Sequence, residues 1–132
     1  MIDEQLAILN AERAREGAPP ATKDRLPNGA YLITVPEVDF GPGWTRRKGT
    51  VLFVAPPGYP AAQPDCFWVE PDGLRVEGGG TPQNTNDSNP IPGDVATRRT
   101  TWFSWHLQSW NPNVDDLKRF FNVVLQRLKP AR

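Results

Sequence analysis

The feature that most constrains the fold is a run of apolar residues at helical spacing near the end of the chain. They fall at positions i, i+3, i+4, i+7, i+8 and i+11: Leu117, Phe120, Phe121, Val124, Leu125 and Leu128. This spacing places all six on one face of an amphipathic helix. Asn113 is expected to cap the helix and Pro130 to end it, which predicts a helix over residues 114–129. Because its apolar face has to be covered, we expect this helix to pack on a sheet.

Short runs rich in β-branched and aromatic residues occupy the middle of the chain, separated by glycine and proline. They predict strands over residues 30–35, 50–54 and 66–69, with a weaker fourth strand over residues 73–76. The connections between these runs are too short to hold crossover helices. We therefore expect the four strands to form an antiparallel meander.

Three other segments complete the expected order. Residues 2–16 carry a thin apolar stripe and predict an N-terminal helix that packs on the outside of the domain. Residues 77–97 have no apolar periodicity and predict a long irregular loop, of the kind that is often functional or mobile. The segment 100–110 is aromatic and leads into the last helix. At 132 residues the chain has the length of one domain, so we predict a single α+β domain over residues 1–132.

The charge balance and the scarcity of two residue types exclude several functions. Lys+Arg 15 and Asp+Glu 15 cancel, which removes the usual electrostatic argument for binding nucleic acid or an anionic membrane. One cysteine and one histidine exclude a cysteine-rich zinc site and a centre built on several histidines, and no metal or cofactor is predicted. No apolar run is long enough to span a membrane and the N-terminus is not of the signal-peptide type, so we expect a cytoplasmic protein.

Two stretches, in their order along the chain, resemble ubiquitin-conjugating enzymes. Residues 53–64 carry a Tyr-Pro pair followed by another proline, which is similar to a turn between two meander strands of that fold. Residues 110–112 read Trp-Asn-Pro and precede an acidic turn and an amphipathic helix, which resembles the Trp-Ser-Pro start of that fold's second helix. The His-Pro-Asn signature of the eukaryotic enzymes is absent, and no cysteine lies about eight residues before Trp110.

The chain is most similar to the bacterial UBC-like proteins called prokaryotic family E. In that family the segment before the helix carries a Trp…Ser-x-His pattern, which Trp102, Ser104 and His106 match. The resemblance implies a UBC-like fold with the long loop at the active site. It also implies a transferase that accepts a ubiquitin-like modifier from an activating enzyme. An isopeptidase in the same pathway and a setting in antiphage-defence gene clusters are further implications of the resemblance.

Ser104 and His106 are the predicted catalytic pair. Two residues apart on an extended segment, they point to the same side, so the imidazole can take the hydroxyl proton. In the role that the resemblance implies, Ser104 accepts the modifier as an oxyester and passes it to a target. One alternative is an inactive scaffold that binds the activating enzyme or the modifier, with a purely structural histidine; another is an unrelated α+β ligand-binding domain. Thr100, Thr101 and Ser109 are substitute hydroxyls.

Three further groups of residues have expected roles. The amides of the long loop are candidates to stabilise an oxyanion: Asn84, Asn86 and Asn89. Arg98 and Arg99 are expected to hold an acidic surface or a carboxyl tail next to the site. Cys66, the only thiol, lies in an apolar run and is expected to be a small buried core residue and not the nucleophile.

Overall fold

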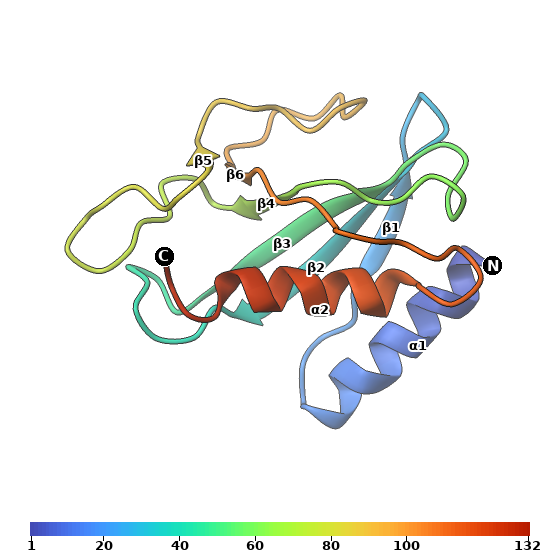
Figure 1. Ribbon diagram of the computed structural model, residues 1–132, viewed down its shortest axis with the longest axis horizontal. Helices are drawn as coiled ribbons and strands as arrows, with labels where there is room; N and C mark the ends of the chain where they lie inside the picture. Colours follow the sequence, from blue (N-terminus) through green and yellow to red (C-terminus); the bar gives the residue numbers. More distant parts are fainter.

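The computed structural model describes residues 1–132 as one antiparallel sheet with two helices on the same face (Figure 1). In chain order the elements are α1 (Ile2–Arg15), β1 (Thr22–Arg25), β2 (Tyr31–Asp39), β3 (Lys48–Ala55), β4 (Phe67–Glu70), β5 (Thr85–Asn86), β6 (Thr101–Phe103) and α2 (Leu117–Leu128). The six strands lie in the order β1-β2-β3-β4-β6-β5. The structure thus confirms the α+β class and a C-terminal helix packed on the sheet.

The sheet differs from the predicted four-stranded meander. Three of the predicted strands correspond to β2, β3 and β4, but residues 73–76 form no strand, and Val76 makes only an isolated bridge. The main-chain N–H of Leu74 donates to the side-chain hydroxyl of Thr101 at 3.2 Å. Because a side chain takes this donor, the segment does not join the ladder of the sheet.

Three strands have no counterpart in the sequence prediction. β1 pairs with β2 and extends the sheet at one edge. β5 lies inside the loop that is predicted to be irregular, and β6 lies in the aromatic segment. β6 pairs with β4 on one side and with β5 on the other, so the aromatic segment becomes part of the sheet.

α2 begins later than predicted. The sequence predicts a helix over residues 114–129 capped by Asn113, whereas α2 starts at Leu117. The cap is Asp116, whose carboxylate accepts a hydrogen bond from the N–H of Arg119 at 2.8 Å. Asn113 lies in the preceding turn, where its own N–H donates to a neighbouring side chain.

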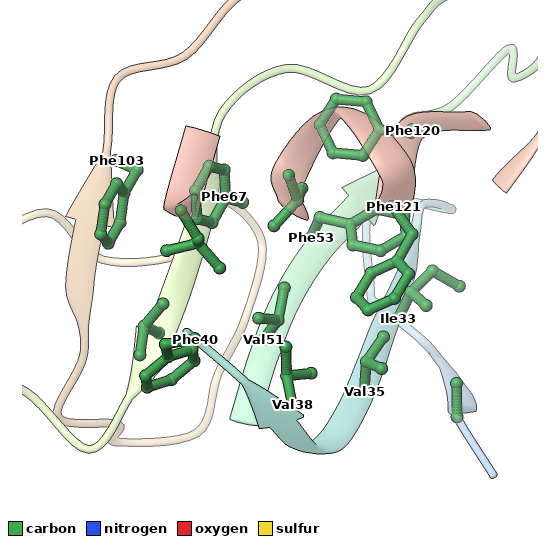
Figure 2. Close-up of a cluster of buried hydrophobic side chains, with 14 of the residues drawn as sticks. Ile33, Val35, Val38, Phe40, Val51, Phe53, Phe67, Phe103, Phe120 and Phe121 are labelled. Atoms are coloured by element: carbon green, nitrogen blue, oxygen red, sulfur yellow. The ribbon is translucent and has the colours of Figure 1, made fainter. Parts of the chain in front are cut away.

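The larger core lies between the sheet and the helices (Figure 2). Alternate residues of each strand point to this face, and the apolar face of α2 covers them. Phenylalanines from both layers meet there: Phe53, Phe67, Phe103, Phe120 and Phe121. The ring centres of Phe53 and Phe120 are 4.9 Å apart. Burial of a leucine or phenylalanine contributes roughly 1.5–3 kcal/mol, so this layer supplies much of the stability.

The opposite face of the sheet is also covered, by the long loop between β4 and β6. The strand residues that alternate with those of the larger core point to this second face. Leu32, Leu52 and Trp68 form an apolar cluster there with Ile91 of the loop. The indole N–H of Trp68 donates to the main-chain carbonyl of Asn89 at 2.9 Å. The loop is therefore irregular along most of its length but anchored to the sheet.

α1 packs beside α2 through one buried face, in agreement with a predicted helix on the outside of the domain (Figure 1). Leu9 and Arg13 are its buried residues, and the Arg13 guanidinium lies 5.9 Å from the ring centre of Phe121. The side-chain oxygen of Gln5 accepts a hydrogen bond from the N–H of Leu117 at 3.2 Å. Neither helix has the length and hydrophobicity needed to cross a membrane.

Candidate functional site

Ser104, His106 and Asp65 form a chain of polar contacts. The hydroxyl Oγ of Ser104 lies 3.4 Å from Nε2 of His106. The other ring nitrogen, Nδ1, lies 2.5 Å from Oδ1 of Asp65. In this arrangement a carboxylate can orient an imidazole, which in turn faces a hydroxyl.

The pairing of β4 with β6 brings these residues together. The two strands run antiparallel, so the residues just before β4 lie beside those just after β6. Asp65 lies two residues before β4, and Ser104 follows β6 directly. A main-chain hydrogen bond of 3.0 Å from the N–H of Cys66 to the carbonyl of Trp105 continues the pairing beyond the strands.

Asn84 lies beside Ser104 on the opposite side of this segment from β4. The main-chain N–H of Ser104 donates to the carbonyl of Asn84 at 2.9 Å, which continues the pairing of β5 with β6. Asn84 has a φ of 57°, in the left-handed region that asparagine tolerates better than most residues. Its side chain is exposed, so its amide is available to a ligand.

A buried arginine of α2 fixes the same segment from the helix side. Arg127 is 2% exposed, and its guanidinium lies 4.9 Å from the ring centre of Phe103 and 5.7 Å from that of Trp105. It donates to the main-chain carbonyl of Gln83 at 2.8 Å. Burial lowers the pKa of Arg127 to about 10, so the side chain stays charged at neutral pH. Arg127 therefore connects α2 both to the segment that contains Phe103 and Trp105 and to the segment that contains Gln83.

An open cleft of about 390 Å³ lies along this segment. Ser104, His106 and Ser109 line it together with Asn84 and, from α2, Arg119. The side chain of His106 is 62% exposed and that of Asp65 is 57% exposed. Both side chains are thus open to solvent, and water screens their electrostatic interaction.

Cys66 is buried, as expected, but it lies next to the site. It is 7% exposed and directly precedes β4, with a φ of 61°. Its Sγ lies within 4.8 Å of a ring nitrogen of His106 and of a carboxylate oxygen of Asp65. Burial raises the pKa of the Cys66 thiol because the charged thiolate loses its hydration. A protonated, buried thiol is a poor nucleophile.

The other two loop amides lie outside the cleft. Asn86 belongs to β5, pairs with Trp102, and accepts the N–H of Ser88 on its side-chain oxygen at 3.0 Å. Asn89 lies on the second face of the sheet, where its carbonyl accepts from Trp68. Of the three predicted amides, Asn84 is the one that the structure places beside Ser104.

Arg98 and Arg99 lie before β6, at the opposite end of that strand from Ser104. Arg98 forms an ion pair of 2.6 Å with Asp94, and Arg99 forms one of 3.3 Å with Asp72. The structure therefore does not bring the two arginines to the predicted catalytic pair. Their charges face acidic residues of the chain itself.

The substitute hydroxyls divide between two places. Thr100 and Thr101 are buried, and the hydroxyl of Thr101 donates to the carboxylate of Asp87 at 2.6 Å. Ser109 is exposed and lines the cleft with Ser104. Ser109 is therefore the substitute hydroxyl that a substrate in the cleft can reach.

Asp65 is the residue of this contact chain that the sequence analysis does not identify. It is 41 residues from His106 along the chain, and the strand pairing that joins them involves β6, which the sequence did not predict. The signal that was available is a polar residue two positions before an apolar strand. Many surface aspartates share that position, so it does not single out Asp65 on its own.

Comparison with known proteins gives one match. A family model described as prokaryotic E2 family E matches residues 24–131. The match begins within β1 and runs past α2, so it includes Asp65, Ser104 and His106 and leaves out α1. No curated protein and no solved structure matches the chain.

Proposed function

The chain belongs to the prokaryotic E2 family E, and from this premise we propose that it transfers a ubiquitin-like modifier through an oxyester on Ser104. Membership supports a ubiquitin-conjugating-like role in general, with an activating enzyme and a modifier protein as partners. The serine acceptor, the ester chemistry and the roles of individual residues are the proposal.

The observation that carries the proposal is the contact chain from Ser104 through His106 to Asp65. In the tautomer with its proton on Nδ1, His106 donates a hydrogen bond of 2.5 Å to Asp65, and Nε2, 3.4 Å from the Ser104 hydroxyl, is free to accept a proton. Contacts of this kind are often long in an enzyme without its substrate and shorten when the substrate binds. His106 can therefore act as the general base, with Asp65 as the residue that orients it.

The first step is the attack of Ser104 on the activated C-terminal carbonyl of the modifier. A bond forms between Oγ and the carbonyl carbon while the hydroxyl proton passes to Nε2 of His106. The bond from that carbon to the leaving group then breaks, releasing the thiolate of the activating enzyme or, from an adenylate, AMP. His106 returns its proton to a thiolate leaving group or to solvent. The product is an ester between the modifier and Ser104.

The second step passes the modifier to an amine of a target. An alkyl ester is a poorer acylating agent toward amines than a thioester, so the acceptor has to be positioned closely. The open cleft of about 390 Å³ beside Ser104 gives the acceptor access. His106 can take the proton that the attacking amine loses and give it to the departing Ser104 oxygen.

Each step passes through an oxyanion, which needs a hydrogen-bond donor. The exposed amide of Asn84 is the candidate, because its main chain is fixed beside Ser104 by the 2.9 Å hydrogen bond. Asn86 and Asn89 lie outside the cleft, and Arg98 and Arg99 lie at the other end of β6. The proposed role of the two asparagines is therefore to anchor the loop, and that of the two arginines is to bind a partner. None of the four acts at the reacting atoms.

An inactive scaffold that binds the activating enzyme or the modifier is the second candidate. The exposure of His106 and Asp65 favours it, since a pair in contact with water orients a base less strongly than a buried pair. The covalent step separates the two candidates, because a scaffold forms no adduct.

The test is incubation of the protein with its activating enzyme, ATP and the modifier. We expect a higher-mass species that survives thiol reductant and is cleaved by hydroxide, since an alkoxide leaves less readily than a thiolate. Ser104→Ala should abolish the species, and Ser104→Cys should replace it with one that reductant removes. Ser109→Ala is the matched control, because this hydroxyl lines the same cleft.

Three results would contradict the serine mechanism, and a fourth would show that a target lysine has been modified. A reductant-sensitive adduct in the unmutated protein, or loss of the adduct in folded Cys66→Ala protein, would identify the thiol as the nucleophile. A complete absence of adduct would favour the scaffold. An adduct that resists both reagents would be an isopeptide to lysine, and would indicate modification of a target.

An isopeptidase that removes the modifier and a role in antiphage defence complete the proposed pathway. These two parts depend on family membership alone and not on any residue of the site. Neighbouring genes for an activating enzyme, a ubiquitin-like protein and an isopeptidase would support them.

A further inference from the structure

The only cysteine and the only histidine of the chain lie together with an aspartate. One ligand atom from each of Asp65, Cys66 and His106 lies within 4.8 Å of the other two. The donor atoms of a tetrahedral zinc site are roughly 3–4 Å apart, given Zn–S and Zn–N distances of about 2.3 and 2.0 Å. Binding an ion therefore requires two small movements. The Cys66 thiol has to approach the other two ligand atoms by about an ångström, and Nδ1 of His106 and Oδ1 of Asp65, which lie 2.5 Å apart, have to separate by about an ångström.

The backbone accounts for this grouping. In an extended strand, neighbouring residues such as Asp65 and Cys66 point to opposite faces. The φ of 61° at Cys66 interrupts this alternation, and both side chains approach His106. The hydrogen bond of 3.0 Å from the N–H of Cys66 to the carbonyl of Trp105 fixes the two segments side by side.

We propose that Asp65, Cys66 and His106 bind a zinc ion, and that this ion blocks transfer by Ser104. A thiolate, an imidazole and a carboxylate form a ligand set that zinc accepts and that magnesium and calcium do not prefer. Three protein ligands leave a fourth position for water, as in other open zinc sites. Cys66 lies at the base, 7% exposed, while Asp65 and His106 are open to the solvent from which the ion comes. On binding, the thiol gives its proton to solvent.

The position of the ion decides its effect on the site. Nδ1 of His106 faces Asp65 at 2.5 Å, so an ion that takes both side chains as ligands binds at Nδ1. A neutral imidazole bound to metal through Nδ1 carries its proton on Nε2. Nε2 then cannot accept the Ser104 proton. This blocking effect rests on the proposed function, whereas binding of the ion does not.

The direct test uses Co²⁺ as a spectroscopic probe and Zn²⁺ in calorimetry, on the full chain without activating enzyme. We expect one ion per chain, a thiolate-to-cobalt charge-transfer band in the near ultraviolet, and loss of the band when Zn²⁺ is added. Cys66→Ala should remove the band. Asp65→Asn and His106→Gln, both at exposed positions, should each weaken Zn²⁺ binding at least about tenfold. Mg²⁺ should not compete.

Ser104→Ala separates this inference from the proposed function. It should bind Zn²⁺ as the unmutated protein does while forming no modifier adduct. In the unmutated protein Zn²⁺ should slow adduct formation, and a chelator should restore it. Absence of a thiolate band, or unchanged affinity in both Asp65→Asn and His106→Gln, would overturn the metal site. Adduct formation at the same rate with the site saturated by Zn²⁺ would overturn the blocking effect.

Discussion

The indole nitrogen of Trp110 donates a hydrogen bond of 2.7 Å to the main-chain carbonyl of Pro60. The ring centres of Trp110 and Tyr59 are 5.9 Å apart, so the two are also in aromatic contact. These residues belong to the two stretches, 50 positions apart, on which the resemblance to ubiquitin-conjugating enzymes rests. The resemblance therefore corresponds to one physical junction, which joins the segment before β4 to the segment before α2.

Replacement of Trp110 by phenylalanine should weaken this junction. Phenylalanine keeps most of the aromatic contact but leaves the Pro60 carbonyl without its donor, which costs about 1–2 kcal/mol. The free energy of unfolding from urea denaturation measures the loss. Asn113→Ala, an exposed change nearby, is the control, and an equal effect of the two substitutions would contradict the role of the hydrogen bond.

The cap of α2 gives a second stability prediction. Asp116→Ala should lower the free energy of unfolding by about 1 kcal/mol, because the N–H of Arg119 loses the carboxylate that accepts its hydrogen bond of 2.8 Å. Asn113→Ala, at the position where the sequence alone places the cap, should stay within about 0.5 kcal/mol of the unmutated protein. Urea denaturation of both variants distinguishes the two assignments, and the reverse order of effects would show that the helix begins earlier.

His106 should matter through its proton transfer. His106→Ala should slow formation of the Ser104 adduct by roughly 10²–10⁴-fold, the usual range for loss of a general base. Single-turnover rates with preformed activated modifier measure this directly. Circular dichroism of the variant is the check on folding, and a rate within a factor of two of the unmutated protein would exclude a general-base role.

Asp65 should act through the orientation of His106. Asp65→Asn keeps the size of the side chain but offers an N–H to Nδ1, which favours the tautomer with its proton on Nε2, facing Ser104. We expect adduct formation to slow by roughly 10²-fold, less than the ~10⁴-fold of a buried triad aspartate, because water screens this exposed pair. Asp24→Asn, at an exposed position of β1, is the matched control. When Asp65→Asn is added to His106→Ala, the rate of adduct formation should fall little further. Additive losses of rate would show that Asp65 acts independently of His106.

The carboxylate of Asp87 gives a prediction on pH. Partial burial raises its pKa, but hydrogen bonds from Arg75, Thr101 and the N–H of Gly73 outweigh this and lower it overall. A lowered pKa means that the carboxylate stabilises the fold above its unfolded pKa of about 3.9, and that this contribution disappears as pH falls through the folded value.

The free energy of unfolding of Asp87→Asn should therefore be about 1–2 kcal/mol lower than that of the unmutated protein at pH 7. This difference in free energy should become smaller below about pH 4. Urea denaturation at a series of pH values measures the difference. Asp24→Asn is again the control for loss of one exposed charge. A gap that stays constant from pH 7 to acid pH would show that the carboxylate acts through its shape and not through its charge.

The regular parts of this fold were predictable because they repeat a local pattern. α2 has unbroken helical periodicity, and β2 and β3 contain runs rich in β-branched residues. The C-terminal helix identified from spacing alone is the one that covers the sheet. β1 was missed because its four residues, Thr-Lys-Asp-Arg, show no apolar alternation. The strand that the sequence predicts over residues 73–76 is wrong because the N–H groups of Leu74 and Arg75 bond to threonine hydroxyls, which no local pattern indicates.

The site was predictable only where it is local. Ser104 and His106 are two residues apart, so strand geometry alone places their side chains together. Asp65, Asn84 and Cys66 reach them through the pairing of β6 with β4 and β5, two partners that leave no periodic trace in so short a strand. The same limit explains why Arg98 and Arg99, although close in sequence, lie away from Ser104 and His106.

The two outer strands of the sheet have a consequence for behaviour at high concentration. An edge with free N–H and C=O groups can recruit a strand from another molecule and begin fibril growth. Here one edge is β1, with exposed charges at Asp24 and Arg25, and the other is β5, only two residues long. Charge repels an incoming strand at the first edge, and the second is too short to template one. Ordered aggregation would therefore require part of the native sheet to open first.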